Sequence, residues 1–201
     1  MDTSTKRRRT RLSPEQRREQ LLNTAMEVFA LRGIGRAGHA EIAEIAQVSV
    51  ATVFNYFPTR EDLVDVVLAQ AEREFALVLK RCFQSAETPL KQGVTALLDG
   101  LMVSVQQQVA WVRVWFEWST STRDEVWPKF LQGHNETNQF FIESYETAKR
   151  QGEIRTEALQ ADTFADYLHG ICYVLFIRAT VSRDEALIRR KTNEFLELIF
   201  N

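Results

Sequence analysis

Apolar residues recur at three- and four-residue intervals over most of the chain, which is the spacing of helices with one buried face. The first predicted helix begins after Ser13, whose hydroxyl can cap it, and ends at Gly33. Beyond residue 59 the same spacing predicts helices at about 60–84, 88–118, 124–151, 158–181 and 183–200. No segment shows the strict alternation of a strand, so the pattern predicts an all-α fold of about nine helices.

The stretch 37–63 predicts two short helices joined by a tight turn, which is the arrangement of a helix-turn-helix DNA reader. Ile42, Ile45 and Ala46 share one helical face, so the first short helix can bury that face and end near Gln47. The other interpretation is an ordinary helical corner whose exposed face is polar by chance. The residues of the second short helix favour the DNA reader.

That second helix is predicted to begin at Ser49, whose side-chain oxygen can accept from the first free amides. Val53 faces inward, and Val50 is a candidate both for the inner face and for the DNA groove. The residues that point outward are Ala51, Thr52 and Asn55. Small residues let a helix approach base edges closely, and asparagine can bond adenine in two places. This face is the predicted base-reading surface.

A net charge of −2 hides a split in sign along the chain. Residues 1–60 hold ten Lys and Arg against six Asp and Glu, whereas residues 61–201 hold 15 against 21. Within the first part, Lys6 and four arginines crowd residues 6–11, where mutual repulsion opposes folding. Such an arm can enter a narrow minor groove, and the alternative is a solvated tail. The N-terminal part is therefore expected to meet a polyanion.

The composition favours a cytoplasmic protein with no membrane partner. No apolar run reaches the roughly 18 residues of a membrane span, and the arginine-rich N-terminus lacks the apolar segment of a signal peptide. Cys82 and Cys172 lie far apart without metal-motif spacing, so both are expected to be buried thiols.

The sequence predicts no enzyme, no cofactor and no metal. It contains no Walker loop, glycine-rich dinucleotide turn, Gly-x-Ser-x-Gly elbow or His-Glu-x-x-His motif. His169 and Cys172 could share a helix face, but two ligands without a nearby carboxylate pair make a poor metal site. His39 is expected to cap a helix or to lie near a DNA phosphate.

Two blocks of the N-terminal region resemble the DNA-binding domain of TetR-family transcription regulators. They are IAEIAQVS at 42–49 and FNYFPTREDL at 54–63. Gln47 replaces the usual glycine of the turn, and a non-glycine residue can adopt a left-handed conformation at modest cost. The resemblance implies a three-helix helix-turn-helix domain followed by a helical regulatory and dimerisation domain. The predicted divisions are a disordered basic arm (1–12), a DNA-binding domain (13–60) and a ligand-binding and dimerisation domain (61–201).

A narrower resemblance links the chain to the LuxR/HapR-type quorum-sensing master regulators. It rests on RTRLSP at 9–14, RGIGR at 32–36, GHA at 38–40, VWFEWS at 114–119 and STRDEVWP at 121–128. The match is strong over 9–65 and 114–128, moderate near 137–139 and 169–173, and poor over 66–110 and the last thirty residues. The DNA-binding half is therefore expected to share more with these regulators than the ligand-binding half does.

The family resemblance implies a homodimer that binds double-stranded DNA at pseudo-palindromic sites. Two readers related by symmetry also supply the base contacts that one short helix lacks. Asn55 is expected to read bases, Ser49 and Tyr56 to hold phosphates, and the arm to reach the minor groove. The full predicted DNA-binding set is Arg9, Arg11, Ser49, Val50, Ala51, Thr52, Asn55 and Tyr56.

Apolar residues on the last two predicted helices are candidates either for the dimer interface or for the core of one chain. They are Phe164, Leu168, Ile171, Leu175, Phe195, Leu198 and Ile199. The resemblance also implies a pocket for a small apolar ligand, although apolar residues at this spacing equally describe plain core. The predicted pocket lining is Phe75, Leu79, Leu101, Trp115, Asn135, Gln139 and Cys172.

Together these observations predict a sequence-specific transcription regulator, with the narrower resemblance favouring a master regulator that both activates and represses. Activation would require a contact with RNA polymerase, for which the sequence identifies no surface. One alternative is a repressor released by a small molecule. The other is a helical ligand-binding module that has lost DNA binding, which predicts no salt-dependent affinity for DNA.

Overall fold

The computed structural model describes residues 12–85, 87–154, 159–181 and 184–200, and this part of the chain forms nine α-helices and no strand. The helices divide between two compact units, residues 1–67 and 68–201. One helix, α4 (Arg60–Cys82), contributes its first two turns to the first unit and the remainder to the second. The predicted all-α fold is confirmed.

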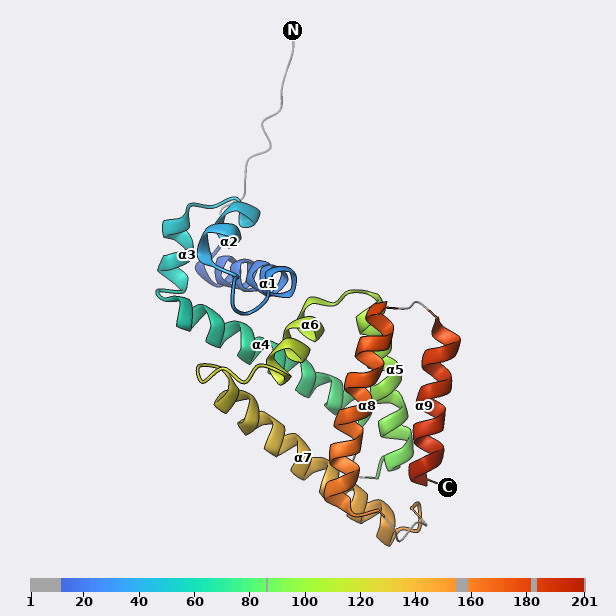
Figure 1. Cartoon of the computed structure of the whole chain (residues 1–201). Helices are drawn as coiled ribbons and strands as arrows, with labels where there is room; N and C mark the ends of the chain where they lie inside the picture. The colour runs from blue at the N-terminus through green and yellow to red at the C-terminus, as the bar shows by residue number, and fades with distance from the viewer. Residues whose placement is uncertain (1–11, 86, 155–158, 182–183, 201) are drawn as a thin grey trace. The chain divides into compact units, whose positions relative to one another are not determined.

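The first unit packs α1 (Pro14–Arg32), α2 (His39–Ala46) and α3 (Val50–Tyr56) against the start of α4 (Figure 1). Local signals define where these helices begin. The Ser13 side chain accepts from the backbone N–H of Gln16, whose own side chain accepts from the backbone N–H of Ser13. Thr59 and Asp62 form the same reciprocal pair at the start of α4.

The turn between α2 and α3 is closed by a residue that is not glycine. Gln47 takes the left-handed conformation with φ of 54°, and its backbone N–H donates to the carbonyl of Glu44. The expectation that glutamine can replace glycine at this turn is thereby confirmed. Phe29, Ile42, Val53 and Phe57 are fully buried beneath the turn and fix the angle between the two short helices.

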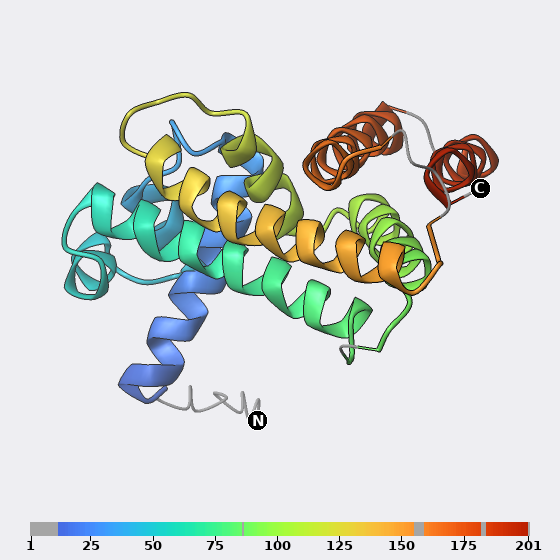
Figure 2. The ribbon, with the colours of Figure 1, turned by 90° about the horizontal axis from the view of Figure 1, so that it is seen from below.

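The second unit contains α5 (Leu90–Gln106), α6 (Ala110–Ser119), α7 (Trp127–Arg150), α8 (Ala161–Val181) and α9 (Glu185–Phe200). Helices α5, α8 and α9 lie side by side, and α7 runs alongside the second half of α4 (Figures 1 and 2). The five helices α5, α6, α7, α8 and α9 share a single apolar core. Its fully buried side chains include Leu98, Tyr145 and Phe164.

One predicted helix, 88–118, is wrong as a single element. The structure divides it into α5 and α6, because the backbone reverses at Gln108, which has φ of 57°. The break lets Val105 of α5 and Val112 of α6 both enter the core. The apolar spacing alone did not indicate this break, because the three residues between the helices include neither proline nor glycine.

Candidate nucleic-acid interface and ligand cavity

Helix α3 presents most of its surface away from the core, because Val53 is its only buried residue. Val50, Ala51 and Asn55 are exposed, and Thr52 and Tyr56 are half-buried. Of the two alternatives for Val50, the inner face is excluded, since 42% of its surface is exposed. Apart from Phe54, which is 45% exposed, the exposed side chains of α3 are small or able to hydrogen-bond, which suits close approach to base edges.

The start of α3 is fixed by Ser49, whose hydroxyl oxygen accepts from the backbone N–H of Thr52 at 3.1 Å. The hydroxyls of Ser49 and Thr52 also share a hydrogen bond of 2.8 Å. Both predicted contact residues therefore act in the cap, and a contact with DNA would add to that role.

The end of α3 is held by His39, a residue that the sequence indicated only as a cap or a phosphate neighbour. Its Nε2 donates to the backbone carbonyl of Phe57 at 2.7 Å, and its ring stacks on Phe54 with centroids 4.0 Å apart. His39 is buried, so this contact supports the cap and leaves α3 anchored at both ends. Arg9 and Arg11, the predicted minor-groove residues, lie outside the described residues.

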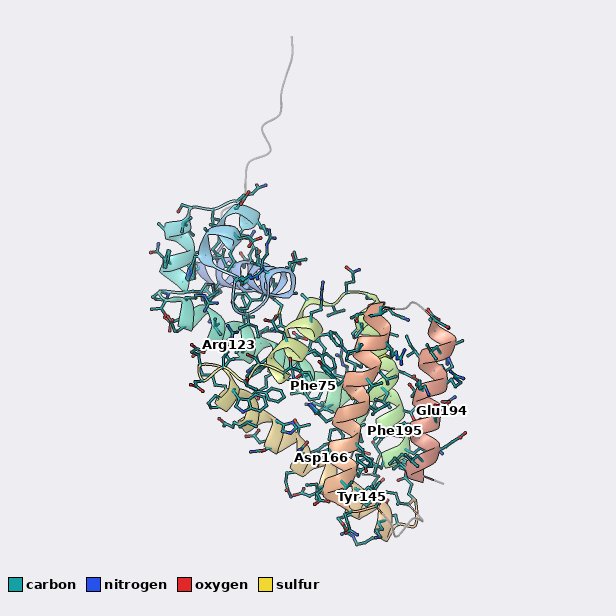
Figure 3. All side chains as sticks on the ribbon, in the orientation of Figure 1. Phe75, Arg123, Tyr145, Asp166, Glu194 and Phe195 are labelled. Carbon is teal, nitrogen blue, oxygen red and sulfur yellow. The ribbon has the colours of Figure 1, made fainter. Side chains whose placement is uncertain are left out.

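The second unit encloses a cavity of about 240 Å³ between α4, α5, α6, α7 and α8. The ring of Phe75, labelled in Figure 3, lies 4.8 Å from that of Trp115, and the Trp115 ring lies 5.1 Å from Phe116. Five of the seven predicted pocket residues line it: Phe75, Leu79, Leu101, Trp115 and Cys172. These five residues, of which Phe75 and Trp115 are aromatic, thus border the same cavity.

The polar half of the pocket prediction is wrong for Asn135 and Gln139, which are exposed on the far face of α7. Gln139 instead donates to Glu143 on the next turn. The residues that α7 turns into the cavity include His134, Thr137 and Asn138, whose spacing of three and four marks one helix face. That spacing was the available signal, because Phe141, which is buried, continues the same face.

Two histidines, His134 and His169, meet edge to face in the cavity, with ring centroids 4.9 Å apart. Burial lowers the pKa of both His134 and His169, while the charge of Asp166 opposes that shift. Asn138 donates its amide N–H to Nε2 of His134 at 3.1 Å, so that nitrogen acts as the acceptor of a neutral ring. Burial also raises the pKa of the Cys172 thiol to about 12, which keeps it protonated.

The residues proposed for the dimer interface are mostly core. The buried members are Phe164, Leu168, Leu175, Phe195 and Ile199. Ile171 is half-buried, and Leu198 is 71% exposed. The interpretation as intrachain core, left open by the sequence, therefore holds for the buried residues. Leu198 is the only member of the set with a large exposed apolar surface.

Helix α8 also has a second, exposed apolar face, which was not predicted from the sequence. Its residues follow the alternating three- and four-residue spacing of a helix seam: Tyr167, Gly170, Val174, Ile177 and Val181. All five are exposed, Val181 to 84%, and a Cβ at Gly170 would meet nothing within 4 Å. We call these five residues the outer stripe of α8. The signal was present in the spacing, but the inner face of the same helix matched it equally well.

Helix α8 therefore carries apolar residues on both its buried and its exposed face. Among the described helices, α8 alone is long and apolar enough to cross a membrane by length and composition, a test that core helices also pass. The described residues contain no group of three or more His, Cys, Asp or Glu able to hold a metal ion.

Comparison with known proteins identifies the family. Residues 21–67 match the family model described as bacterial regulatory proteins, tetR family. The chain is 46% identical to the HTH-type transcriptional regulator LuxR of Vibrio harveyi over 200 residues, covering 99% of this chain and 96% of that protein.

Solved structures share the fold at low sequence identity. A TetR-family regulator from Agrobacterium tumefaciens superimposes with a TM-score of 0.80 at 16% identity, covering 94% of this chain and all of that one. AibR, solved with isovaleryl coenzyme A and operator DNA, gives 0.72 at 18% identity over 92% of this chain and 98% of its own. The chain therefore belongs to the TetR family of bacterial transcriptional regulators, in which a helix-turn-helix domain binds DNA and no enzymatic activity is expected.

Proposed function

We propose that this regulator binds pseudo-palindromic operators as a homodimer, with α3 of each protomer in the major groove. The observation that carries the proposal is the exposed face of α3, where Ala51 and Asn55 stand clear of the core on a helix capped at its start and held at its end. A short helix held at both ends keeps its side chains in a fixed register with the bases.

The proposed contacts differ in kind. Asn55 reads a base edge, Val50, Ala51 and Thr52 lie against it, and Tyr56 together with Ser49 meets the phosphates. Arg9 and Arg11 supply the minor-groove contact as an expectation from the sequence. Base contacts give specificity, whereas phosphate contacts give salt-dependent affinity.

The test is a fluorescence-anisotropy titration of a duplex library at several salt concentrations. Asn55→Ala should lose about 1–3 kcal/mol of discrimination at one or two positions while keeping its salt slope. Asn135→Ala removes an exposed asparagine from the second unit and is the matched control. Discrimination that is unchanged in Asn55→Ala would contradict the assignment, and affinity indifferent to sequence and salt would contradict DNA reading altogether.

The outer stripe of α8, together with Leu198 of α9, supports the proposed homodimer. Two copies of such a seam can pack as a four-helix bundle, and the exposed Gly170 lets two helices approach closely. Ile177→Glu should convert the dimer to a monomer in sedimentation analysis, because it places a charge in an apolar seam. Val103→Glu, at an equally exposed valine on α5, is the control. A dimer that survives Ile177→Glu would place the interface elsewhere.

We further propose that the regulator acts as a quorum-sensing master regulator that activates some promoters and represses others, with the LuxR relationship as support. The second candidate is a repressor released by a small ligand, which the cavity supports. Transcription measured genome-wide with and without the gene separates them: a master regulator changes transcripts in both directions, whereas a simple repressor only raises them on deletion. Helix α4, which lines the cavity with Phe75 and begins in the reader unit, is the proposed route of any ligand effect.

A further inference from the structure

We propose that the cavity of the second unit selects small amphiphilic cations, namely amines with an aromatic or branched apolar body, over neutral and anionic molecules of the same shape. The inference names the ligand class of the proposed regulatory cavity and does not depend on DNA binding. It follows from three features of the lining: aromatic faces, carboxylates with no lysine or arginine among the lining residues, and neutral imidazoles.

The aromatic faces surround Trp115. Its ring lies 4.8 Å from Phe75, 5.1 Å from Phe116 and 5.8 Å from Phe130. Such a cluster accepts an apolar body by burial and attracts a cation through the negative faces of the rings, most strongly at tryptophan. At about 240 Å³ the cavity lies near the lower end of ligand-site volumes, which favours a compact ligand.

The charge of the lining has one sign. Glu72 of α4 and Glu136 of α7 both border the cavity, and no lysine or arginine of the described residues lines it. The carboxylate of Glu72 lies directly over Gly133 of α7, where a Cβ would collide with its Oε1. The absence of a side chain at Gly133 thus gives this carboxylate its place against α7.

A bound cation would stabilise the charged carboxylate of Glu72. Partial burial raises the pKa of Glu72, and the nearby charge of Glu136 raises it further. An ammonium group between the two carboxylates would compensate both effects, because it restores the favourable interactions lost with water and screens their repulsion. Arg73, outside the lining, offsets part of the charge of Glu72, but an anion in the cavity would still add a third negative charge where no lining residue is cationic.

The two histidines of the cavity do not repel a cation, because their rings are neutral. Their pKa values lie below the usual range because of burial, so both rings are neutral at neutral pH. His134 accepts from Asn138, which is the role of an uncharged ring. Asp166, labelled on α8 in Figure 3, adds a further negative charge that acts on both histidines. The charged residues among the cavity lining are therefore both acidic.

The test uses three probes with one phenylbutyl body and different heads: 4-phenylbutylamine, 4-phenylbutanol and 4-phenylbutyrate. Isothermal titration of the full-length protein at pH 7.5, without DNA, should show the amine binding about tenfold more tightly than the alcohol, with the carboxylate weakest. Equal affinity for amine and alcohol would make the cavity a neutral apolar site and overturn the proposal, as would preference for the carboxylate.

Substitutions of Glu72 and Glu136 test whether their carboxylates cause the preference for the amine. Glu72→Gln keeps the shape of the side chain and should reduce the affinity for the amine about tenfold, to that of the alcohol, while leaving the alcohol unchanged. Glu136→Gln should act in the same direction, and Glu146→Gln, exposed on α7 outside the cavity, should change nothing. An amine preference that survives both cavity substitutions would overturn the assignment. Because no DNA is present, this outcome is independent of the operator test.

Discussion

The two units obtain their structure from different sources. In the reader unit, side-chain caps at Ser13, Ser49 and Thr59 define where three of its helices begin. In the second unit, α6 and α7 begin without a side-chain cap, and the first two backbone N–H groups of α5 donate to the carboxylate of Glu153, which is distant in the sequence. Contacts with distant segments therefore determine where these helices begin. A helix defined locally presents a rigid face, whereas helices defined by packing can leave space between them. The first property suits reading bases, and the second suits holding a ligand.

The largest expected difference is in the loss of folding stability when one phenylalanine from each unit is replaced by alanine. Phe57→Ala removes a fully buried ring from the reader core and should cost about 3–5 kcal/mol of stability. Phe75→Ala removes a half-buried ring beside an existing cavity, so it mainly enlarges that cavity and should cost about 1–2 kcal/mol. Urea unfolding followed by circular dichroism measures both changes.

Tryptophan fluorescence sharpens this comparison, because all four tryptophans lie in the second unit. For Phe57→Ala we expect an early transition in circular dichroism that fluorescence does not report. For Phe75→Ala both signals should shift together. If Phe75→Ala costs as much as Phe57→Ala, the space beside Phe75 is not a cavity in solution.

The same contrast explains what the sequence could predict. The reader was predicted almost residue by residue, because its signals, such as the Ser49 cap and the pair Thr59 and Asp62, act within three positions. The exception is Val50, which its apolar character left open between the inner face and the exposed face, and which the structure exposes on the first turn of α3. Short-range chemistry defines a cap, but exposure depends on the neighbouring helices.

Prediction was weaker in the second unit because its features depend on contacts between distant segments. The break at Gln108 has no proline or glycine to signal it. The polar lining was assigned to Asn135 and Gln139 because their amides match those of related proteins, yet the helix face that meets the cavity carries His134 and Asn138. Only the positions of α4, α6 and α8 decide which face of α7 is inside.

The pH dependence of stability should differ between native and substituted cavities. Burial lowers the pKa of His134 and His169 in the folded state, so the unfolded chain binds more protons as pH falls below the usual histidine range near ~6.5. Their contribution is complete above that value and is lost on acidification. The urea midpoint followed by tryptophan fluorescence should therefore fall between pH 7.5 and 5.5, and His169→Gln should reduce that fall.

Asp166 and Glu72 also affect how the stability changes with pH, and each does so in a direction that can be measured. Asp166 raises the pKa of both histidines, so Asp166→Asn should make the fall in midpoint larger. The raised pKa of Glu72 acts with the other sign, adding stability as its carboxylate gains a proton at lower pH. Asp99→Asn, at an exposed position on α5, should leave the dependence unchanged. A midpoint that rises on acidification to pH 5.5 would contradict neutral, buried histidines.

The smallest expected effects come from the two residues other than glycine with positive φ among those described, one in each unit: Gln47 and Gln108. A left-handed conformation costs such a residue about 1 kcal/mol, and glycine removes that cost but adds about 0.5–1 kcal/mol of unfolded-state entropy. Gln47→Gly and Gln108→Gly should therefore raise stability by at most about 0.5 kcal/mol. Gln106→Gly, within α5, keeps only the entropic loss and should lower stability by up to about 1 kcal/mol. If both turn substitutions instead destabilise as much as Gln106→Gly, the glutamine side chains hold these turns more strongly than the left-handed backbone strains them, in the reader and the cavity unit alike.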